Sequence, residues 1–121
     1  MVKALFDTNI LIDYLNAIPE ARAELGRFAD KAISIVTWME VMAGAAVDVA
    51  DSTRSYLAGY RTIAIDFAVA ERAVALRKAH RVRLPDAIIW ATAQHNGMLL
   101  VTRNTKDFPA SDPGVRHPYQ L

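Results

Sequence analysis

The sequence contains no cysteine, and this absence excludes several classes of protein. Without thiols the chain has no disulfide scaffold, no thiolate zinc site and no cysteine nucleophile. Histidine is also scarce, because only His80, His95 and His117 occur and they are scattered along the chain. We therefore expect no metal site built from histidine, and the composition suits a reducing cytoplasm.

Long apolar runs and a strong net charge are missing as well. No apolar stretch reaches the roughly 20 residues of a membrane helix, and the first residues lack the pattern of a signal peptide. The 14 Lys and Arg nearly balance the 13 Asp and Glu, so the formal net charge is only +1 and any nucleic-acid surface must be local. Because 53% of the residues are hydrophobic, we expect one soluble, cytoplasmic domain over residues 1–121.

Strand-like and helix-like segments alternate along the chain. Apolar runs predict strands at residues 2–6, 32–36, 61–65 and 98–102, with a short edge strand at 115–119. Helical spacing and helix signals predict helices at residues 10–15, 18–30, 37–45, 52–60, 67–80 and 84–97. Thr37 and Glu40 fit a capping box, and Asp66 precedes its helix as a cap. The alternation predicts an α/β sandwich with a mostly parallel sheet of four to five strands.

Acidic and amide side chains follow the ends of the predicted strands. Asp7 comes directly after the first strand, Glu40 lies just past the second, and Asn104 and Asp107 lie just past the fourth. Asp86 opens a helix so apolar around its circumference that it must be largely buried, close to the sheet. Sites in open α/β sheets form at the carboxyl ends of the strands, so we expect these side chains to converge at one edge.

Each of these residues also has a purely structural interpretation. Asp7 and Glu40 could cap helices, and Asp107 could belong to a turn. Asp86 could interact favourably with the positive end of its helix dipole. Their joint placement favours a site, because carboxylates held together repel unless a cation lies between them. With no cysteine and no clustered histidine, the expected ion is a hard one, Mg²⁺ or Mn²⁺.

Three segments carry a family resemblance. "LFDTNILIDYL" (5–15), "SIVTWMEVMAG" (34–44) and "LPDAIIWATAQHNGMLLVTRNTKDF" (84–108) together resemble, in this order, a PIN domain of the VapC toxin type. The resemblance covers nearly the whole chain. It implies a three-layer α/β/α fold and a magnesium-dependent endoribonuclease that acts as the toxin of a type II toxin–antitoxin pair. It also implies a VapB-like antitoxin as partner and a homodimer.

The resemblance assigns roles by motif. Asp7, Glu40 and Asp86 match the three family acids, and the fourth polar position falls on Asn104, with Asp107 close behind. Asn104 is neutral where some relatives carry an acid, so either Asp107 or a water could serve there instead. We expect Asp7 and Asp86 to bind the metal directly, and Glu40 to bind it or to help deprotonate the attacking water.

A ribonuclease also needs positive contacts beside its acids. The stretch "RKAHRVR" (77–83) leads into Asp86 and supplies Arg81 and Arg83, while Arg103 and Lys106 flank the fourth position. A solvated helix end is the alternative interpretation of that stretch, since cations favour helix C-termini. So small a cluster favours single-stranded or looped RNA over a duplex.

Two other functions are compatible with parts of the sequence. A phosphorelay receiver domain also gathers acids and Mg²⁺, but the chain lacks its lone strand-end aspartate combined with a lysine ending the last strand. A non-catalytic PIN-like RNA-binding or scaffold protein would not need the carboxylates. Trp38, Met39 and Met42 either join the core or form part of an antitoxin groove.

Overall fold

The computed structural model describes residues 2–121, which form five strands and six α-helices. In chain order the elements are β1 (Lys3–Phe6), α1 (Thr8–Leu15), α2 (Pro19–Leu25), β2 (Asp30–Ser34), α3 (Ile35–Gly44), the 3₁₀ turn η1 (Val47–Val49), α4 (Ala50–Leu57), β3 (Arg61–Ile63), α5 (Phe67–His80), α6 (Leu84–His95), β4 (Leu99–Val101) and β5 (Val115–Arg116). Each strand is short, so the loops and helix ends that follow the strands make up much of the sheet's carboxyl edge.

The five strands form one sheet in the order β3-β2-β1-β4-β5, and every neighbouring pair is parallel. The predicted α/β class and sheet size are confirmed. The first strand of the chain, β1, lies in the middle, with β2 and β4 as its neighbours. Asp7 follows β1 directly and therefore lies at the centre of the carboxyl edge.

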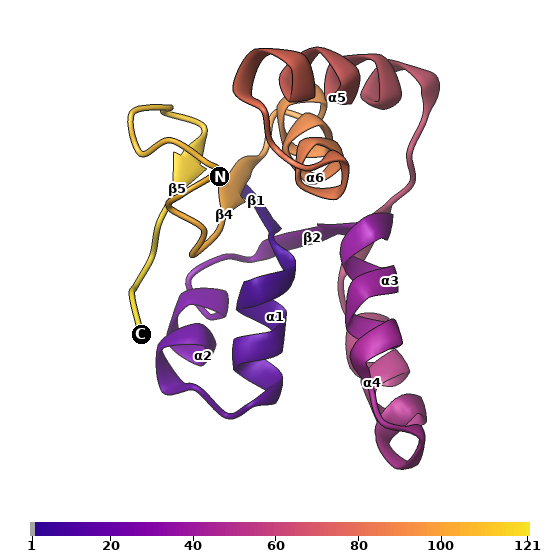
Figure 1. Ribbon diagram of the computed structural model, residues 1–121. Coiled ribbons are helices and arrows are strands. Elements are labelled where there is room, and N and C mark those ends of the chain that lie inside the picture. Colours follow the sequence, from indigo (N-terminus) through magenta and orange to yellow (C-terminus); the bar gives the residue numbers. More distant parts are fainter. Residues whose placement is uncertain (1) are drawn as a thin grey trace.

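Both faces of the sheet are covered by helices (Figure 1). Alternate residues of β1 point to opposite faces, as strand geometry requires. Ala4 and Phe6 pack into a core with residues of α1, α2, α3 and α4, whereas Leu5 packs into a second core with residues of α6. The helix α5 lies outside α6, where Val69 and Ala73 meet the small side chains of α6. The expected three-layer α/β/α arrangement is confirmed.

Local signals explain where several helices begin and end. The Asp66 carboxylate accepts a 2.8 Å hydrogen bond from Val69 N, so its predicted cap is confirmed. Asp7 is likewise the N-cap of α1 and accepts a 2.7 Å bond from Thr8 N. After α6 the chain turns at Gly97, whose φ of +63° is a conformation that glycine adopts without steric cost.

The boundary between β2 and α3 differs from the sequence prediction. The strand runs from Asp30 to Ser34, not over 32–36, and the helix begins at Ile35. Its N-cap is Ser34, whose hydroxyl accepts a 3.1 Å bond from Val36 N. The Thr37–Glu40 capping box is therefore wrong, because Thr37 is already inside the helix. The apolar, β-branched Ile35 and Val36 resemble a strand locally, but the serine before them starts the helix.

Other predicted elements are confirmed in type but are shorter or shifted. The predicted helix 18–30 ends at Leu25. The predicted helix 52–60 corresponds to α4, which begins two residues earlier, directly after η1, and ends at Leu57. The strands predicted at 2–6, 61–65 and 98–102 each lose residues at an end, because apolar residues continue beyond the hydrogen-bonded ladder. No helix within residues 2–121 is long and apolar enough to cross a membrane.

Candidate functional site

A pocket of about 340 Å³ lies at the carboxyl edge of the sheet. It is lined by Asp7, Thr8, Asn9, Ile12, Asp13, Glu40, Arg83, Asp86, Arg103 and Asn104. Four of the five predicted catalytic residues thus line one pocket, although they come from four separate parts of the chain. The fifth, Asp107, is not among the residues that line it, but it contacts Asn104.

Asp7 is a buried acid of the pocket, with only 4% of the residue exposed. Its Oδ1 accepts the capping bond from Thr8 N, and its Oδ2 accepts bonds from Thr102 Oγ1 at 2.7 Å and Asn9 Nδ2 at 3.1 Å. Burial raises the pKa of Asp7 to about 6, although the bonds from Thr102 and Thr8 act in the opposite direction. The structural and functional interpretations of Asp7 are therefore compatible, because one carboxylate caps α1 and also faces the pocket.

Glu40 projects from α3 and is solvent-exposed. Its Oε1 accepts a 2.6 Å hydrogen bond from the Thr8 hydroxyl, which also lies 3.1 Å from the hydroxyl of Thr37. Thr8 thus places the Glu40 carboxylate over the start of α1, next to Asp7. The charge of Glu40 contributes to the raised pKa of Asp7, although less than burial and the charge of Asp86 do.

Asp86 lies in the first turn of α6 and is buried. Burial raises its pKa, the nearby charge of Arg83 lowers it, and the charges of Asp107 and Glu40 raise it. Arg83 Nη2 lies 3.4 Å from Asp86 Oδ2, but the Arg83 side chain is 77% exposed, so this pair is loose.

Asn104 and Asp107 form a closed pair in the loop after β4. Asn104 Nδ2 donates to Asp107 Oδ2 at 2.9 Å, and Asp107 N donates back to Asn104 Oδ1 at 3.0 Å. Asn104 N also donates to Thr102 Oγ1 at 3.0 Å. The pair gives this loop a fixed shape, in which Asn104 lines the pocket and Asp107 is bonded to Asn104.

The predicted RNA-binding cations differ in their surroundings. Arg83 lines the pocket, while Arg81 and Lys106 are exposed. Arg103 instead makes two hydrogen bonds to the buried Asp13, from Nε at 2.5 Å and from Nη2 at 3.0 Å. The bond from Asp13 holds the pKa of Arg103 above its usual range, and the charge of Arg103 is already compensated inside the protein.

The donors of this pocket suit a hard divalent cation. Carboxylate and amide oxygens surround it, and the mutual repulsion of Asp7, Glu40 and Asp86 is of the kind that a cation relieves. Across residues 2–121, however, no group of three or more acidic or histidine side chains lies close enough to hold a metal ion by itself.

Several residues of the site were not anticipated from the sequence. Thr8, Asn9 and Thr102 hold the carboxylates of Asp7 and Glu40, and Asp13 holds Arg103. The polar run that follows β1, "DTN", and the threonine directly after β4 were the available signals. Asp13 gave no such signal, because a single acid within an amphipathic helix is usually a solvated residue.

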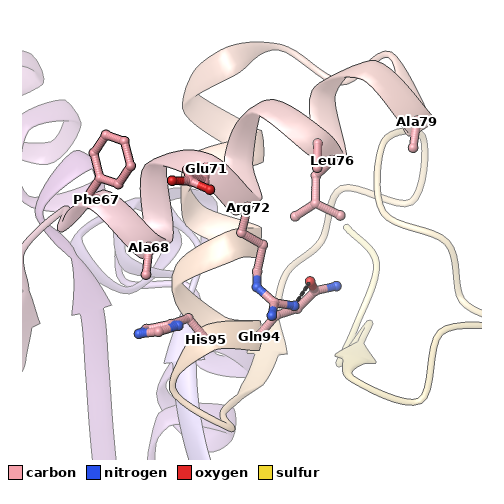
Figure 2. Close-up of a pocket in the computed structure, with 9 residues that line it drawn as sticks. Phe67, Ala68, Glu71, Arg72, Leu76, Ala79, Gln94 and His95 are labelled. Atoms are coloured by element: carbon pink, nitrogen blue, oxygen red, sulfur yellow. Dashed lines mark hydrogen bonds between the residues drawn. The ribbon is translucent and has the colours of Figure 1, made fainter.

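A larger pocket, of about 700 Å³, lies between α5 and α6 (Figure 2). Its lining includes Phe67, Glu71, Leu76 and His95, and the dashed line marks a hydrogen bond from Arg72 to Gln94. Glu71 is the only acid among its lining residues. The larger volume is therefore not where the acids converge, and the smaller pocket is the better candidate for chemistry.

Comparison with known families and structures gives a consistent result. Residues 4–111 match the PIN domain. A toxin-antitoxin complex from Klebsiella pneumoniae contains a chain that is 50% identical, with a TM-score of 0.94, and the match covers 98% of this chain and 100% of that one. FitAcB from Neisseria gonorrhoeae is 26% identical with a TM-score of 0.78, covering 98% and 99% of the two chains.

DNA-bound VapBC from Salmonella typhimurium has a TM-score of 0.74 over 96% of each chain. At 24% identity this last likeness shows the shared fold alone. A comparison with curated proteins finds no match.

Proposed function

Because the chain belongs to the PIN domain family, we propose that it is a Mg²⁺-dependent endoribonuclease and the toxin of a type II toxin–antitoxin pair. The observation that carries the nuclease proposal is the convergence of Asp7, Glu40 and Asp86 on one pocket at the carboxyl edge of the sheet. The toxin role is supported by the 50% identity, over nearly the whole chain, to a protein of a toxin-antitoxin complex.

The side chains of the pocket divide the work of phosphodiester hydrolysis. Asp7 and Asp86 would hold the Mg²⁺, or Mn²⁺ in its place, which when bound neutralises phosphate charge and lowers the pKa of water. Glu40 is fixed through Oε1 by Thr8, so its Oε2 is available to accept a proton from the attacking water. Asn104, which lines the pocket, and Asp107, which is bonded to it, would orient waters or complete a second metal position.

The substrate we propose is single-stranded or looped RNA. Arg83 lines the pocket and offers positive charge to the phosphates that flank the scissile bond. Arg81, close to Arg83 in sequence, and Lys106, close to Asn104, are exposed and would add to this charge. Their small number suits one strand rather than a duplex-spanning surface.

The deciding experiment is cleavage of cellular RNA by the purified protein. We expect cleavage with Mg²⁺ or Mn²⁺, none in excess EDTA, and a loss of activity in Asp86→Asn. Asp66→Asn is the matched control, because it neutralises an aspartate at the start of the neighbouring helix, outside the pocket. Undiminished cleavage in EDTA would contradict the proposal. RNA binding without cleavage by the wild type would instead favour a non-catalytic RNA-binding protein.

A toxin requires a restraint, and we propose a VapB-like antitoxin as the partner of a homodimeric, cytoplasmic enzyme. An acidic pocket is well suited to an inserted Arg or Lys side chain, which would compete with the metal for the carboxylates. Complex formation with its cognate antitoxin should therefore weaken Mn²⁺ binding and abolish cleavage together. If the complex binds Mn²⁺ as tightly as the free enzyme does, this mode of inhibition is wrong.

A further inference from the structure

Arg103 connects the carboxyl end of β4 to α1 through both its backbone and its side chain. Its backbone N–H donates to Asn9 Oδ1 at 3.1 Å, and its guanidinium makes the two bonds to Asp13. Asn9 and Asp13 are four residues apart, so they lie on the same face of α1, one turn apart. One arginine thus spans a full turn of the helix. We call these contacts the Arg103 staple.

The C-terminal segment joins the same contacts. The Tyr119 hydroxyl donates to Asp13 Oδ2 at 2.9 Å, so segments 90 and 106 residues away from Asp13 meet on its carboxylate. Asp13 is only 6% exposed. A buried carboxylate needs such partners, because breaking a buried ion pair leaves an uncompensated charge and destabilises strongly.

The staple bears on the reactive acids through Asn9 and Thr102. Asn9 Nδ2 donates to Asp7 Oδ2 at 3.1 Å and lies 3.3 Å from Thr102 Oγ1. Thr102 directly precedes Arg103 and donates to the same Asp7 oxygen. Movement of the loop after β4 relative to α1 would therefore change both of the side-chain hydrogen bonds that orient Asp7.

We propose that Arg103 is a positioning residue, held by Asp13, that fixes the orientation of Asp7 and is not a contact to RNA. That Asp7 is a metal-binding acid whose orientation matters rests on the proposed nuclease function. A guanidinium that left Asp13 to reach a phosphate would abandon a buried carboxylate that it contacts twice. Arg81 and Lys106 are exposed, and Arg83, whose side chain is 77% exposed, makes only a loose 3.4 Å pair with Asp86. This inference replaces the expectation that Arg103 binds RNA.

The chain contains a matched control for this ion pair. Glu24 on α2 is 4% exposed and accepts two bonds from Arg116, from Nε at 2.6 Å and from Nη2 at 3.0 Å. The geometry and burial resemble those of Asp13 and Arg103, but Glu24 does not line the acidic pocket. Glu24→Gln and Asp13→Asn are therefore equivalent changes in one fold, and only the second disturbs the staple.

The first experiment needs neither metal nor RNA. Amide hydrogen exchange of the folded protein in EDTA is followed by NMR at Arg103 and Asn104, whose N–H groups bond to Asn9 and Thr102. We expect exchange at these amides to accelerate by roughly 10-fold or more in Asp13→Asn, as local opening becomes easier, and to change little in Glu24→Gln. Equal effects of the two variants would overturn the staple, whether or not the protein is a nuclease.

The second experiment separates positioning from RNA contact. Loss of a positioning residue should lower kcat by about 10-fold to 100-fold and weaken Mn²⁺ binding, measured by calorimetry without RNA, while leaving KM nearly unchanged. Arg103→Lys keeps the charge but not the forked geometry, so it should fail like Arg103→Gln. Recovery of activity in Arg103→Lys, or tighter RNA binding in Asp13→Asn, would show an RNA contact and overturn the proposal.

The two experiments also separate the two proposals. A wild type that neither cleaves RNA nor binds Mn²⁺ would refute the nuclease function and the role of the staple in it. The exchange measurement would still decide whether Arg103 fixes the loop after β4 on α1.

Discussion

At the scale of single residues, Asp86 has two interpretations that predict opposite signs. As a member of the acidic pocket it is buried near like charges, so Asp86→Asn should melt at a higher temperature than the wild type in EDTA. As a residue that serves only the N-terminus of α6, it should be stabilising, and its loss should cost roughly 0.3–1 kcal/mol. Differential scanning fluorimetry of both proteins measures the difference.

A magnesium titration completes this test. The wild type should gain about 2.7 kcal/mol of stability at a hundredfold excess over Kd, and Asp86→Asn should gain much less. Asp66→Ala serves as control, because it removes a cap outside the pocket and should cost about 1 kcal/mol with or without Mg²⁺. If Asp86→Asn is less stable than the wild type in EDTA, and Mg²⁺ does not stabilise the wild type, Asp86 serves only the helix dipole of α6.

The raised pKa of Asp7 predicts how the stability of the metal-free protein depends on pH. Its pKa is about 6 in the folded protein and 3.8 ordinarily, so between these values the folded state binds a proton that the unfolded state has released. Stability should therefore fall as the pH rises through this window, by roughly 2 kcal/mol between about pH 4 and pH 6. Asp86 acts in the same direction.

Thermal melts in EDTA at several pH values test this dependence. Asp7→Asn should flatten the curve over this window, because the amide does not titrate. If the mutant keeps the full wild-type slope, burial of Asp7 is not its cause.

At the scale of elements, the start of α3 determines where Glu40 projects. Ser34 is fully buried, and its hydroxyl satisfies Val36 N. Ser34→Ala should therefore cost about 1 kcal/mol in urea unfolding, the typical loss for an N-cap serine. Ser52→Ala is the control, since that serine is exposed in the first turns of α4, and it should change stability by less than about 0.5 kcal/mol. Equal losses in the two variants would argue against the cap.

At the scale of the whole molecule, a net charge of +1 hides a local separation of charge. Acids gather in the pocket, and Arg81, Arg83 and Lys106 supply the proposed RNA contacts. Replacing each of these three by Gln should lower the slope of log K against log salt by about 0.7 for single-stranded RNA. Fluorescence anisotropy in an Asp86→Asn background measures binding without cleavage.

A cation elsewhere on the molecule controls for general charge. Arg61 begins β3, at the amino end of the sheet, and pairs with Asp30 at 2.9 Å. Arg61→Gln should leave the salt slope unchanged. If it lowers the slope as much as Arg83→Gln does, RNA binding is not localised at the pocket.

The sequence by itself determined the order and type of the elements and the positions of the acids along them. Asp66 caps α5 and Gly97 turns the chain after α6, because both features depend on neighbours within a few residues. The placement of Asp7 and Asp86 at one edge followed in turn from the parallel alternation of strands and helices.

The tertiary structure alone decided which partner each polar group takes. Glu40 bonds to Thr8 and not to the start of its own helix, because α1 lies beside α3 and offers a hydroxyl there. Arg103 bonds to Asp13, 90 residues away, and this pairing is the basis of the proposal that it positions Asp7. Local patterns cannot specify such pairs, since a buried charge takes whichever opposite charge the packed fold brings within hydrogen-bonding distance.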